Sequence, residues 1–150
     1  MTQRTDIDLQ MRDIEALYKW YGTEDFSIAK KAYEYAKKAH LNHQRKSGEP
    51  YIIHPVSSAR ELMVIEPDMV TIVSTLLHDS VSDGDGNLDE IEKIFWAEVR
   101  RIVEALDKIG LIKYRGNQST IDRLQRTLIA MAQDVRSIFV KFADRIDNLR

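Results

Sequence analysis

The chain has 150 residues, of which 43% are apolar and 31% are charged, and its formal net charge is −2. This balance predicts one folded domain that buries roughly 70% of its unfolded surface, and the low net charge argues against a surface for long nucleic acid. Cysteine is absent, which excludes disulfides and thiolate ligands, and neither a run of about 20 apolar residues nor a secretory signal pattern is found, so we expect a cytoplasmic protein without a membrane partner.

Apolar residues recur at spacings of three and four along most of the chain, which predicts an all-α fold. The first predicted helix runs from near Asp25 to near Asn42, with Thr23 as a candidate cap. Its apolar face is made of Phe26, Ala29, Tyr33, Ala36 and His40. The segment from Arg45 to Pro50 combines cations with turn-forming residues, so we expect an ordered surface loop there.

Two further helices carry histidines near their ends. Pro55 suits the first turn of a helix and should hold His54 outside helical geometry just before it. The next helix is expected to begin at Pro67 and to place His78 and Asp79 near its C-terminal end, where an acidic turn over residues 83–87 stops it. The residues that this helix should bury are Ile72, Val73, Leu76 and Leu77.

The second half of the chain is also predicted to be helical. Asn87 and Glu90 have the spacing of a capping box and would open a helical region that includes residues 91–106. After a break at Gly110 and residues 114–118, another helix is expected to begin near Ser119. The last helix should be amphipathic, with a stripe of Val135, Ile138, Phe139, Phe142, Ile146 and Leu149. This stripe is still in phase at Arg150, so we expect the N-terminal fragment of a longer chain.

Four residues of the types that bind metal ions lie at or within these helices: His54, His78, Asp79 and Asp144. A buried imidazole or carboxylate needs a partner, and a divalent metal would supply one. Nitrogen and oxygen ligands suit Mn²⁺, Fe²⁺ or Zn²⁺, and Mn²⁺ is favoured if water and phosphate oxygens complete the coordination. Each residue alone has a simpler explanation: His54 and Asp79 could cap helices, His78 could be a core histidine, and Asp144 could pair with Lys141 or Arg145.

The sequence around these residues resembles the hydrolase domain of the RelA/SpoT family, which belongs to the histidine-aspartate phosphohydrolase superfamily. The matching strings are AHLNHQRKSGEPYIIHP (39–55), LLHDSVSD (76–83), AMAQDVR (130–136) and KFADRIDNLR (141–150). They occur in the family's order within a resemblance that covers roughly residues 25–150. The resemblance implies that residues 1–150 form a single helical domain of the histidine-aspartate phosphohydrolase type.

The activity implied by this resemblance is Mn²⁺-dependent removal of the 3′-pyrophosphate from ppGpp or pppGpp, which gives GDP or GTP. The ligands of one Mn²⁺ ion would be His54, His78, Asp79 and Asp144. The residues that hold the guanine nucleotide would be Arg45, Lys46, Ser47 and Asn148. A planar guanidinium can stack on a base, so Arg45 would lie over the guanine, while Asn148 would face the ribose or its phosphates.

The chain departs from the family pattern at the position expected to activate water. The family has a glutamate-aspartate pair after its metal-binding His-Asp, and here Ser82 replaces the glutamate while Asp83 remains. A serine hydroxyl cannot act as a base at neutral pH, and general acid-base assistance is typically worth about 10² to 10⁴ in rate. Hydrolysis should therefore be slow or absent unless Asp83 or Asp85 substitutes. Asp147 and Trp96 are further departures, since the family usually has histidine and glycine at these positions.

Three hypotheses remain open from the sequence. The first is an alarmone pyrophosphohydrolase domain, joined to a synthetase domain in the full chain. The second is a regulatory domain of a (p)ppGpp synthetase (GTP pyrophosphokinase), which binds metal or guanine nucleotide without turnover, and Ser82 is its main support. The third is an enzyme of the same scaffold that acts on another phosphorylated metabolite, against which the RKSG loop argues.

Overall fold

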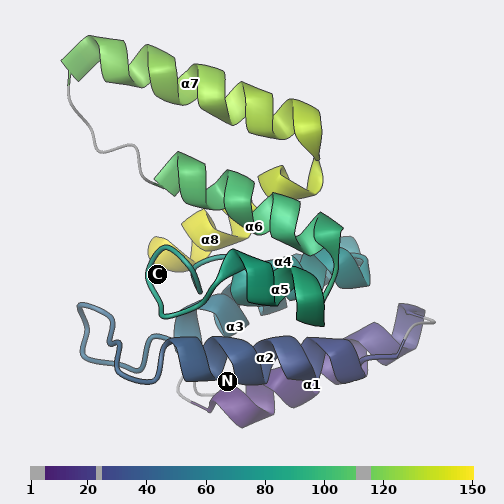
Figure 1. The fold of residues 1–150 in the computed structure, drawn as a ribbon. Coiled ribbons are helices and arrows are strands. Elements are labelled where there is room, and N and C mark those ends of the chain that lie inside the picture. The colour runs from purple at the N-terminus through teal and green to yellow at the C-terminus, as the bar shows by residue number, and fades with distance from the viewer. Residues whose placement is uncertain (1–5, 23–24, 111–115) are drawn as a thin grey trace.

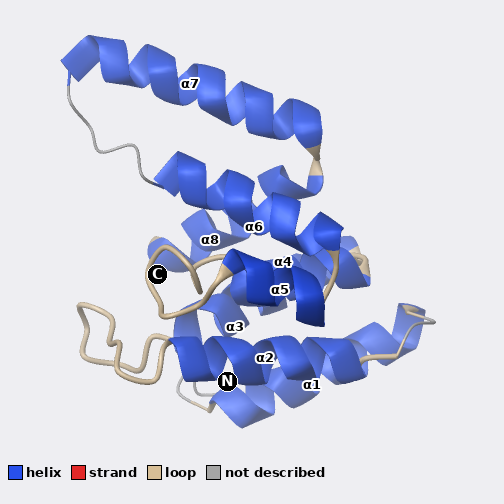
Figure 2. Ribbon diagram, viewed as in Figure 1, coloured by secondary structure: helices blue, strands red, loops and turns tan. Residues whose placement is uncertain are grey.

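The structure of the chain is a computed structural model, which describes residues 6–22, 25–110 and 116–150 (Figure 1). The described residues form an all-α fold without a β-strand, as the periodicity of the sequence predicts (Figure 2). Its helices are α1 (Ile7–Tyr21), α2 (Ser27–Ala39), α3 (Ile53–Leu62), the 3₁₀ helix η1 (Met63–Ile65), α4 (Met69–Leu77), α5 (Leu88–Ile94), α6 (Ala97–Gly110), α7 (Gly116–Gln133) and α8 (Arg136–Asn148). Within this part of the chain, no helix is both long and apolar enough to cross a membrane.

Helix α4 lies at the centre of the fold, where it contacts α2, α3, α6 and α8. In Figure 1, α1 and α2 lie on one side of this centre, and α6 and α7 lie on the other. Every residue of α4 except Val70 is buried, because its sequence is apolar or small on all sides. Asp68 caps the helix by accepting a hydrogen bond from the amide of Thr71, so α4 begins at Met69 and not at Pro67 as the sequence predicts.

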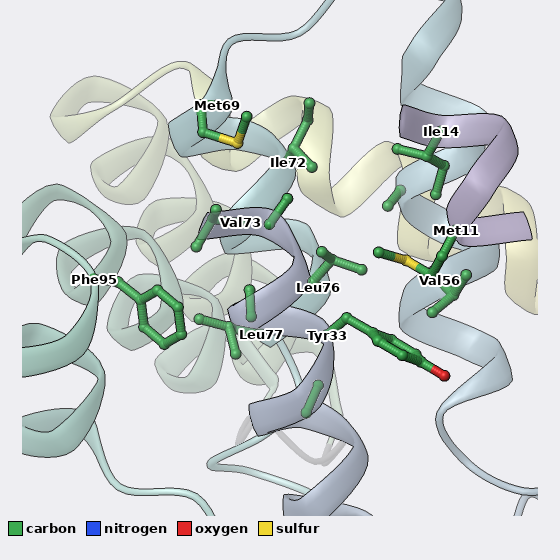
Figure 3. Close-up of a cluster of buried hydrophobic side chains, with 14 of the residues drawn as sticks. Met11, Ile14, Tyr33, Val56, Met69, Ile72, Val73, Leu76, Leu77 and Phe95 are labelled. Atoms are coloured by element: carbon green, nitrogen blue, oxygen red, sulfur yellow. The ribbon is translucent and has the colours of Figure 1, made fainter. Parts of the chain in front are cut away.

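The main hydrophobic core surrounds α4 and joins it to α1, α2 and α3 on one side and to α5 and α6 on the other (Figure 3). Burial of each large aliphatic side chain contributes roughly 1.5–3 kcal/mol to stability. The core side chains labelled in Figure 3 are Met11, Ile14, Tyr33, Val56, Met69, Ile72, Val73, Leu76, Leu77 and Phe95. They include all four residues that the sequence predicts to be buried in the helix before His78, and they hold the end of α4 in a fixed place.

Helix α1 is absent from the elements expected from the sequence, although Ile7, Met11, Ile14, Tyr18 and Tyr21 recur there at helical spacings of four and three. It buries Met11, Ile14 and Tyr18 on the face that contacts α3 and η1. Helix α2 begins at Ser27 and not at Asp25, because the Asp25 carboxylate accepts hydrogen bonds from the Ser27 amide and hydroxyl. The candidate cap Thr23 lies outside the described residues.

The helical region after residue 87 consists of two helices, which are separated at Phe95 and Trp96. Asn87 caps α5 as predicted, since its side chain accepts hydrogen bonds from the amides of Asp89 and Glu90. In a capping box the Glu90 carboxylate would accept directly from the Asn87 amide. Here the Tyr35 hydroxyl lies between them, accepting from the Asn87 amide and donating to the Glu90 carboxylate, both at 3.0 Å. This hydroxyl therefore ties α2 to the start of α5.

One prediction for the C-terminal part is wrong, and a second element differs in which face it buries. Helix α7 begins at Gly116, inside the segment expected to be a break and before Ser119. Helix α8 forms, but the predicted apolar stripe is largely exposed, with Phe142 62% and Leu149 81% accessible. The buried residues of α8 are instead Ser137, Val140, Ala143, Asp144 and Asp147. Because α8 packs closely on α3, this partly polar face points into the protein.

Candidate metal centre

The two histidines and two aspartates expected to bind metal lie together between α3, the end of α4 and α8. Nε2 of His54 is 3.2 Å from Oδ1 of Asp144 and 3.3 Å from Oδ2 of Asp79. Nε2 of His78 is 3.2 Å from the same Asp79 oxygen and 3.9 Å from Asp144 Oδ1. His54, His78 and Asp144 each offer one ligand atom, and these atoms lie within 4.8 Å of one another. They form a possible site for one divalent ion.

The outer nitrogen of each imidazole has a partner that fixes the ring. Nδ1 of His78 lies 2.6 Å from the backbone carbonyl of Thr75, and Nδ1 of His54 lies 2.6 Å from Oδ2 of Asp147. A carbonyl can only accept, so Nδ1 of His78 carries a proton and Nε2 is the nitrogen available to a metal. Although Oδ2 of Asp79 lies 3.2 Å away, this buried Nε2 makes no hydrogen bond of regular geometry with the described residues, which fits a place for an ion.

The structure corrects the predicted backbone of His54. Helix α3 begins at Ile53, so His54 lies inside its first turn and not before the helix. The amides of Ile53 and His54 donate to the carbonyls of Pro50 and Tyr51, so the backbone is already helical in the turn before Pro55. Pro55 is tolerated next to it because the amides of a first turn have no partner within the helix.

The pKa values of the site reflect mutual pairing of its charges. Burial alone would lower the pKa of His54, but its contacts with Asp144, Asp147 and Asp79 raise it to about 10. Burial is likewise outweighed at His78, where the charge of Asp79 raises the pKa to about 9. Burial would raise the pKa of Asp79 and Asp144, but the two histidines hold both well below the usual range. Without metal, the site therefore binds protons on its imidazoles.

These shifts predict opposite pH dependences for stability and for metal binding. A histidine whose pKa is raised on folding stabilises the native state fully below its unfolded pKa of about 6.5, and this contribution is lost as the pH rises through the folded pKa. The melting temperature in EDTA should therefore fall as the pH rises from about 7 towards the folded pKa values of about 9 and 10. A divalent ion must displace the protons, so its affinity should increase over the same range.

Calorimetric unfolding in EDTA and titration with Mn²⁺ at each pH would measure the two trends. A melting temperature that rises with pH in EDTA would contradict the proposed pairing of the histidines with the carboxylates.

The cavity beside these residues contains Ser82. It has a volume of about 450 Å³, and Ser82, Asp83, Lys141, Arg145 and Asn148 line it together with the four metal-type residues. Asp85 is not among the lining residues, so Asp83 is the carboxylate of this turn that faces the cavity. Three backbone hydrogen bonds hold the turn, in which the amides of Asp83, Gly86 and Asp85 donate to the carbonyls of Asp79, Ser80 and Ala39, respectively. A Cβ atom at Gly86 would lie 2.6 Å from the Ser80 carbonyl oxygen, so this close approach requires glycine.

Tyr51 is a site residue to which the sequence assigns no role. Its hydroxyl lies 2.9 Å from Oδ2 of Asp79 and 3.4 Å from Oδ2 of Asp83. Burial and the two carboxylates raise its pKa, so the hydroxyl keeps its proton and donates. The ring stacks on buried His40 at 4.5 Å between centroids, and burial lowers the pKa of that histidine to about 4. In the sequence, Tyr51 lies in the matching string 39–55, three residues before His54.

The predicted cationic loop forms a second cavity next to the first. Arg45, Lys46, Ser47 and Asn148, the four residues expected to hold a nucleotide, line a space of about 520 Å³, and Tyr51 and Asn148 line both cavities. The loop is ordered by two backbone hydrogen bonds, from the Arg45 amide to the Glu49 carbonyl and from the Gly48 amide to the Arg45 carbonyl. The guanidinium of Arg45 lies against α8, 2.6 Å from Oδ2 of Asp147 and 3.3 Å from Oδ1 of Asn148.

The geometry agrees with what the chain is similar to. A family model described as HD domain matches residues 32–150. The chain is 38% identical over 150 residues to a guanosine-3′,5′-bis(diphosphate) 3′-pyrophosphohydrolase of Aquifex aeolicus, covering 100% of this chain and 21% of that protein. It is 37% identical over 136 residues to a GTP pyrophosphokinase of Myxococcus xanthus, covering 88% and 18%. It is 36% identical over 139 residues to the bifunctional (p)ppGpp synthase/hydrolase SpoT of Escherichia coli, covering 91% and 20%.

A solved structure is also similar, from work that describes a metazoan ortholog of SpoT which hydrolyses ppGpp. Its TM-score is 0.65 at 25% sequence identity, and the match covers 86% of this chain and 72% of that chain. The present chain spans about a fifth of the length of the curated relatives that it matches.

Proposed function

Since this chain belongs to the HD domain family, we propose that it is a hydrolase domain that removes the 3′-pyrophosphate of ppGpp or pppGpp with the aid of one Mn²⁺ ion. The observation that carries the proposal is the convergence of His54, His78 and Asp144 on one point beside a cationic loop. Relatives named as ppGpp hydrolases, and a structural neighbour described as hydrolysing ppGpp, support the choice of substrate.

The proposed ligands of the ion are His54, His78, Asp79 and Asp144. Two imidazoles and two carboxylates without thiolate are a donor set that suits Mn²⁺. Asp79 belongs to the set because one of its oxygens lies 3.2–3.3 Å from both imidazole nitrogens. When bound, such an ion supplies Lewis-acid chemistry, by polarising a phosphoryl group and lowering the pKa of water.

The remaining steps belong to side chains of the cavity. Water attacks the phosphorus attached to the 3′-oxygen, and the bond from this phosphorus to the 3′-oxygen breaks. The 3′-oxygen takes up the proton that the attacking water loses, so that GDP or GTP with a free 3′-hydroxyl separates from pyrophosphate. Asp83 takes the proton of the attacking water, because it is the carboxylate of the 80–87 turn that lines the cavity. The Tyr51 hydroxyl, which contacts both Asp79 and Asp83, holds the two carboxylates in a fixed relation.

The loop cavity would hold the nucleotide. Lys46 and Ser47 line it and present a cation and a hydroxyl to phosphate oxygens, and Asn148 is placed where the two cavities meet. Arg45 is hydrogen-bonded through the edge of its guanidinium, and a guanidinium held in this way still offers its flat face to a guanine base.

A second candidate function is favoured by Ser82. With a hydroxyl at the place of the family glutamate, the domain would bind metal and guanine nucleotide without hydrolysing the nucleotide, as a regulatory part of a synthetase. One assay separates the two candidates: purified protein is incubated with Mn²⁺ and ppGpp, and pyrophosphate release and the melting temperature are both measured.

We expect slow pyrophosphate release that EDTA abolishes. A higher melting temperature with ppGpp but without product would support the regulatory candidate. If the assay detects no product and no change in melting temperature, both candidates are contradicted. If pyrophosphate is released from another phosphorylated metabolite but not from ppGpp, the domain acts on a different substrate.

A further inference from the structure

Asp147 lies at the junction between the metal centre and the cationic loop. It is on the inner face of α8, one turn after Asp144, and only 1% of its surface is exposed. A single carboxylate oxygen, Oδ2, lies 2.6 Å from Nδ1 of His54 and 2.6 Å from Nη1 of Arg45. The two groups are 93 and 102 residues away from it in the sequence, so this one atom joins α3 and the loop to α8.

We propose that Asp147 is a positioning residue, which holds the metal-binding imidazole of His54 and the nucleotide-binding guanidinium of Arg45 in one fixed register. The inference rests on the proposed function, since it assumes that the cluster binds a divalent ion and that the loop binds a guanine nucleotide. It assigns to Asp147 no contact with either ligand.

The contact with His54 fixes which ring nitrogen faces the ion. In the metal-bound state His54 is neutral, and a carboxylate can only accept, so the proton of the ring stays on Nδ1 and the lone pair on Nε2. Partners of this kind orient a ligand imidazole and raise its basicity, and their loss typically weakens metal binding about 10- to 100-fold.

The contact with Arg45 fixes the loop. A hydrogen bond between a guanidinium and a carboxylate is charge-assisted, and burial of the acid keeps it from being screened. The same guanidinium also donates to Oδ1 of Asn148, at a longer distance of 3.3 Å. Without Asp147, binding of a nucleotide would have to order the Arg45 side chain, which lowers affinity.

The test uses Mn²⁺ alone and ppGpp alone as probes on the whole chain. Mn²⁺ affinity is measured from the spectrum of the free ion in electron paramagnetic resonance, and ppGpp affinity by equilibrium dialysis in EDTA. The variants are Asp147→Ala, Asp147→Asn, Arg45→Ala and the double variant Asp147→Ala with Arg45→Ala. The matched control is Asp134→Asn, which alters another aspartate paired with an arginine, Arg136, away from the lining of both cavities.

Asp147→Ala should weaken Mn²⁺ binding about 10- to 100-fold and ppGpp binding by roughly tenfold, the loss expected for a hydrogen bond to a charged group. In the Arg45→Ala background the same change should still weaken Mn²⁺ binding but should no longer affect ppGpp binding. Asp147→Asn keeps an acceptor oxygen, so its losses should be smaller, and it replaces the alanine variant in the comparison if that variant does not fold. Asp134→Asn should change neither affinity.

Two results would overturn the inference. An unchanged Mn²⁺ affinity in both Asp147 variants would remove the link to His54 and leave the proposed hydrolysis intact. An equal loss of ppGpp binding with and without Arg45 would show that Asp147 supports the fold and does not act through the loop. Failure of the proposed function differs from both: the unaltered chain would then bind Mn²⁺ but would not bind or hydrolyse ppGpp.

Discussion

Pyrophosphate release from ppGpp is expected to fall at least about 10³-fold when Asp79 is replaced by asparagine, since the loss of bound metal removes several kcal/mol of transition-state stabilisation and each 1.4 kcal/mol corresponds to about tenfold in rate. Asp79 lies 3.2–3.3 Å from both imidazole nitrogens, and its charge is the main reason that the pKa of His78 is raised. Mn²⁺ affinity should fall together with the rate.

The matched control for this change is Asp85→Asn in the turn that follows. It removes the same charge from a side chain that does not line the cavity. Its rate should stay close to that of the unaltered chain. Full activity in Asp79→Asn with unchanged Mn²⁺ binding would show that Asp79 is not a ligand. A collapse of activity in Asp85→Asn would show that Asp85, and not Asp83, accepts the proton of the attacking water.

Replacement of Ser82 by glutamate is expected to raise the rate of hydrolysis at least about tenfold. General acid-base assistance is typically worth about 10² to 10⁴ in rate, so a tenfold gain is a minimum for restoring a base. Ser82 lines the cavity beside Asp83 and its side chain is exposed, so a longer side chain has room to enter. The added carboxylate would accept the proton of the attacking water, a task that we propose for Asp83 in the unaltered chain.

Single-turnover measurements with Ser82→Glu and Ser82→Gln separate chemistry from size. The glutamine variant has nearly the same shape but cannot act as a base, so its rate should not exceed that of the unaltered chain. Equal rates in all three proteins would mean that the position of Ser82 has no part in proton transfer. A gain in both variants would indicate an effect of side-chain length on the fit of the nucleotide.

Much of the fold and the geometry of the cluster can be predicted from the sequence, because each depends on a local pattern. Periodicity of three and four predicts most helices, and the strings around His54, His78 and Asp144 identify the residues that come together. The ordered loop at Arg45 follows from its turn-forming residues. These patterns need no knowledge of how distant helices pack.

The errors occur where packing decides. The apolar stripe of an amphipathic helix ordinarily faces the core, but α8 exposes Phe139 and Phe142 and buries the face with Asp144 and Asp147, which the cluster requires. A polar site thus reverses the ordinary relation between hydropathy and burial. A residue before proline is ordinarily disfavoured in a helix, which led to the wrong prediction for His54. The preceding turn already has helical geometry and places His54 inside α3, and this local preference does not take that turn into account.

The contacts of Asp147 and Tyr51 are also outside the reach of local patterns. Asp147 contacts Arg45 and His54 only because α8 packs against α3 and the loop, and in the sequence it is notable only as a position where we expect the family to have histidine. A neutral imidazole has one acceptor nitrogen and no negative charge, so it could not replace this carboxylate between two donors. The family comparison therefore marks the position but does not reveal its partners.

The central position of α4 has a consequence for how the two halves of the site move. His78 and Asp79 follow directly on a helix that is buried almost all round, whereas Arg45 stands on a surface segment with few packing contacts. Local opening is least frequent in the best-packed elements, so backbone amides of α4 should exchange with deuterium slowest and those of the 44–50 segment among the fastest. The proposed metal centre thus lies on the most protected element of the fold, whereas the backbone of the proposed nucleotide loop opens more often while Asp147 holds the Arg45 side chain against α8.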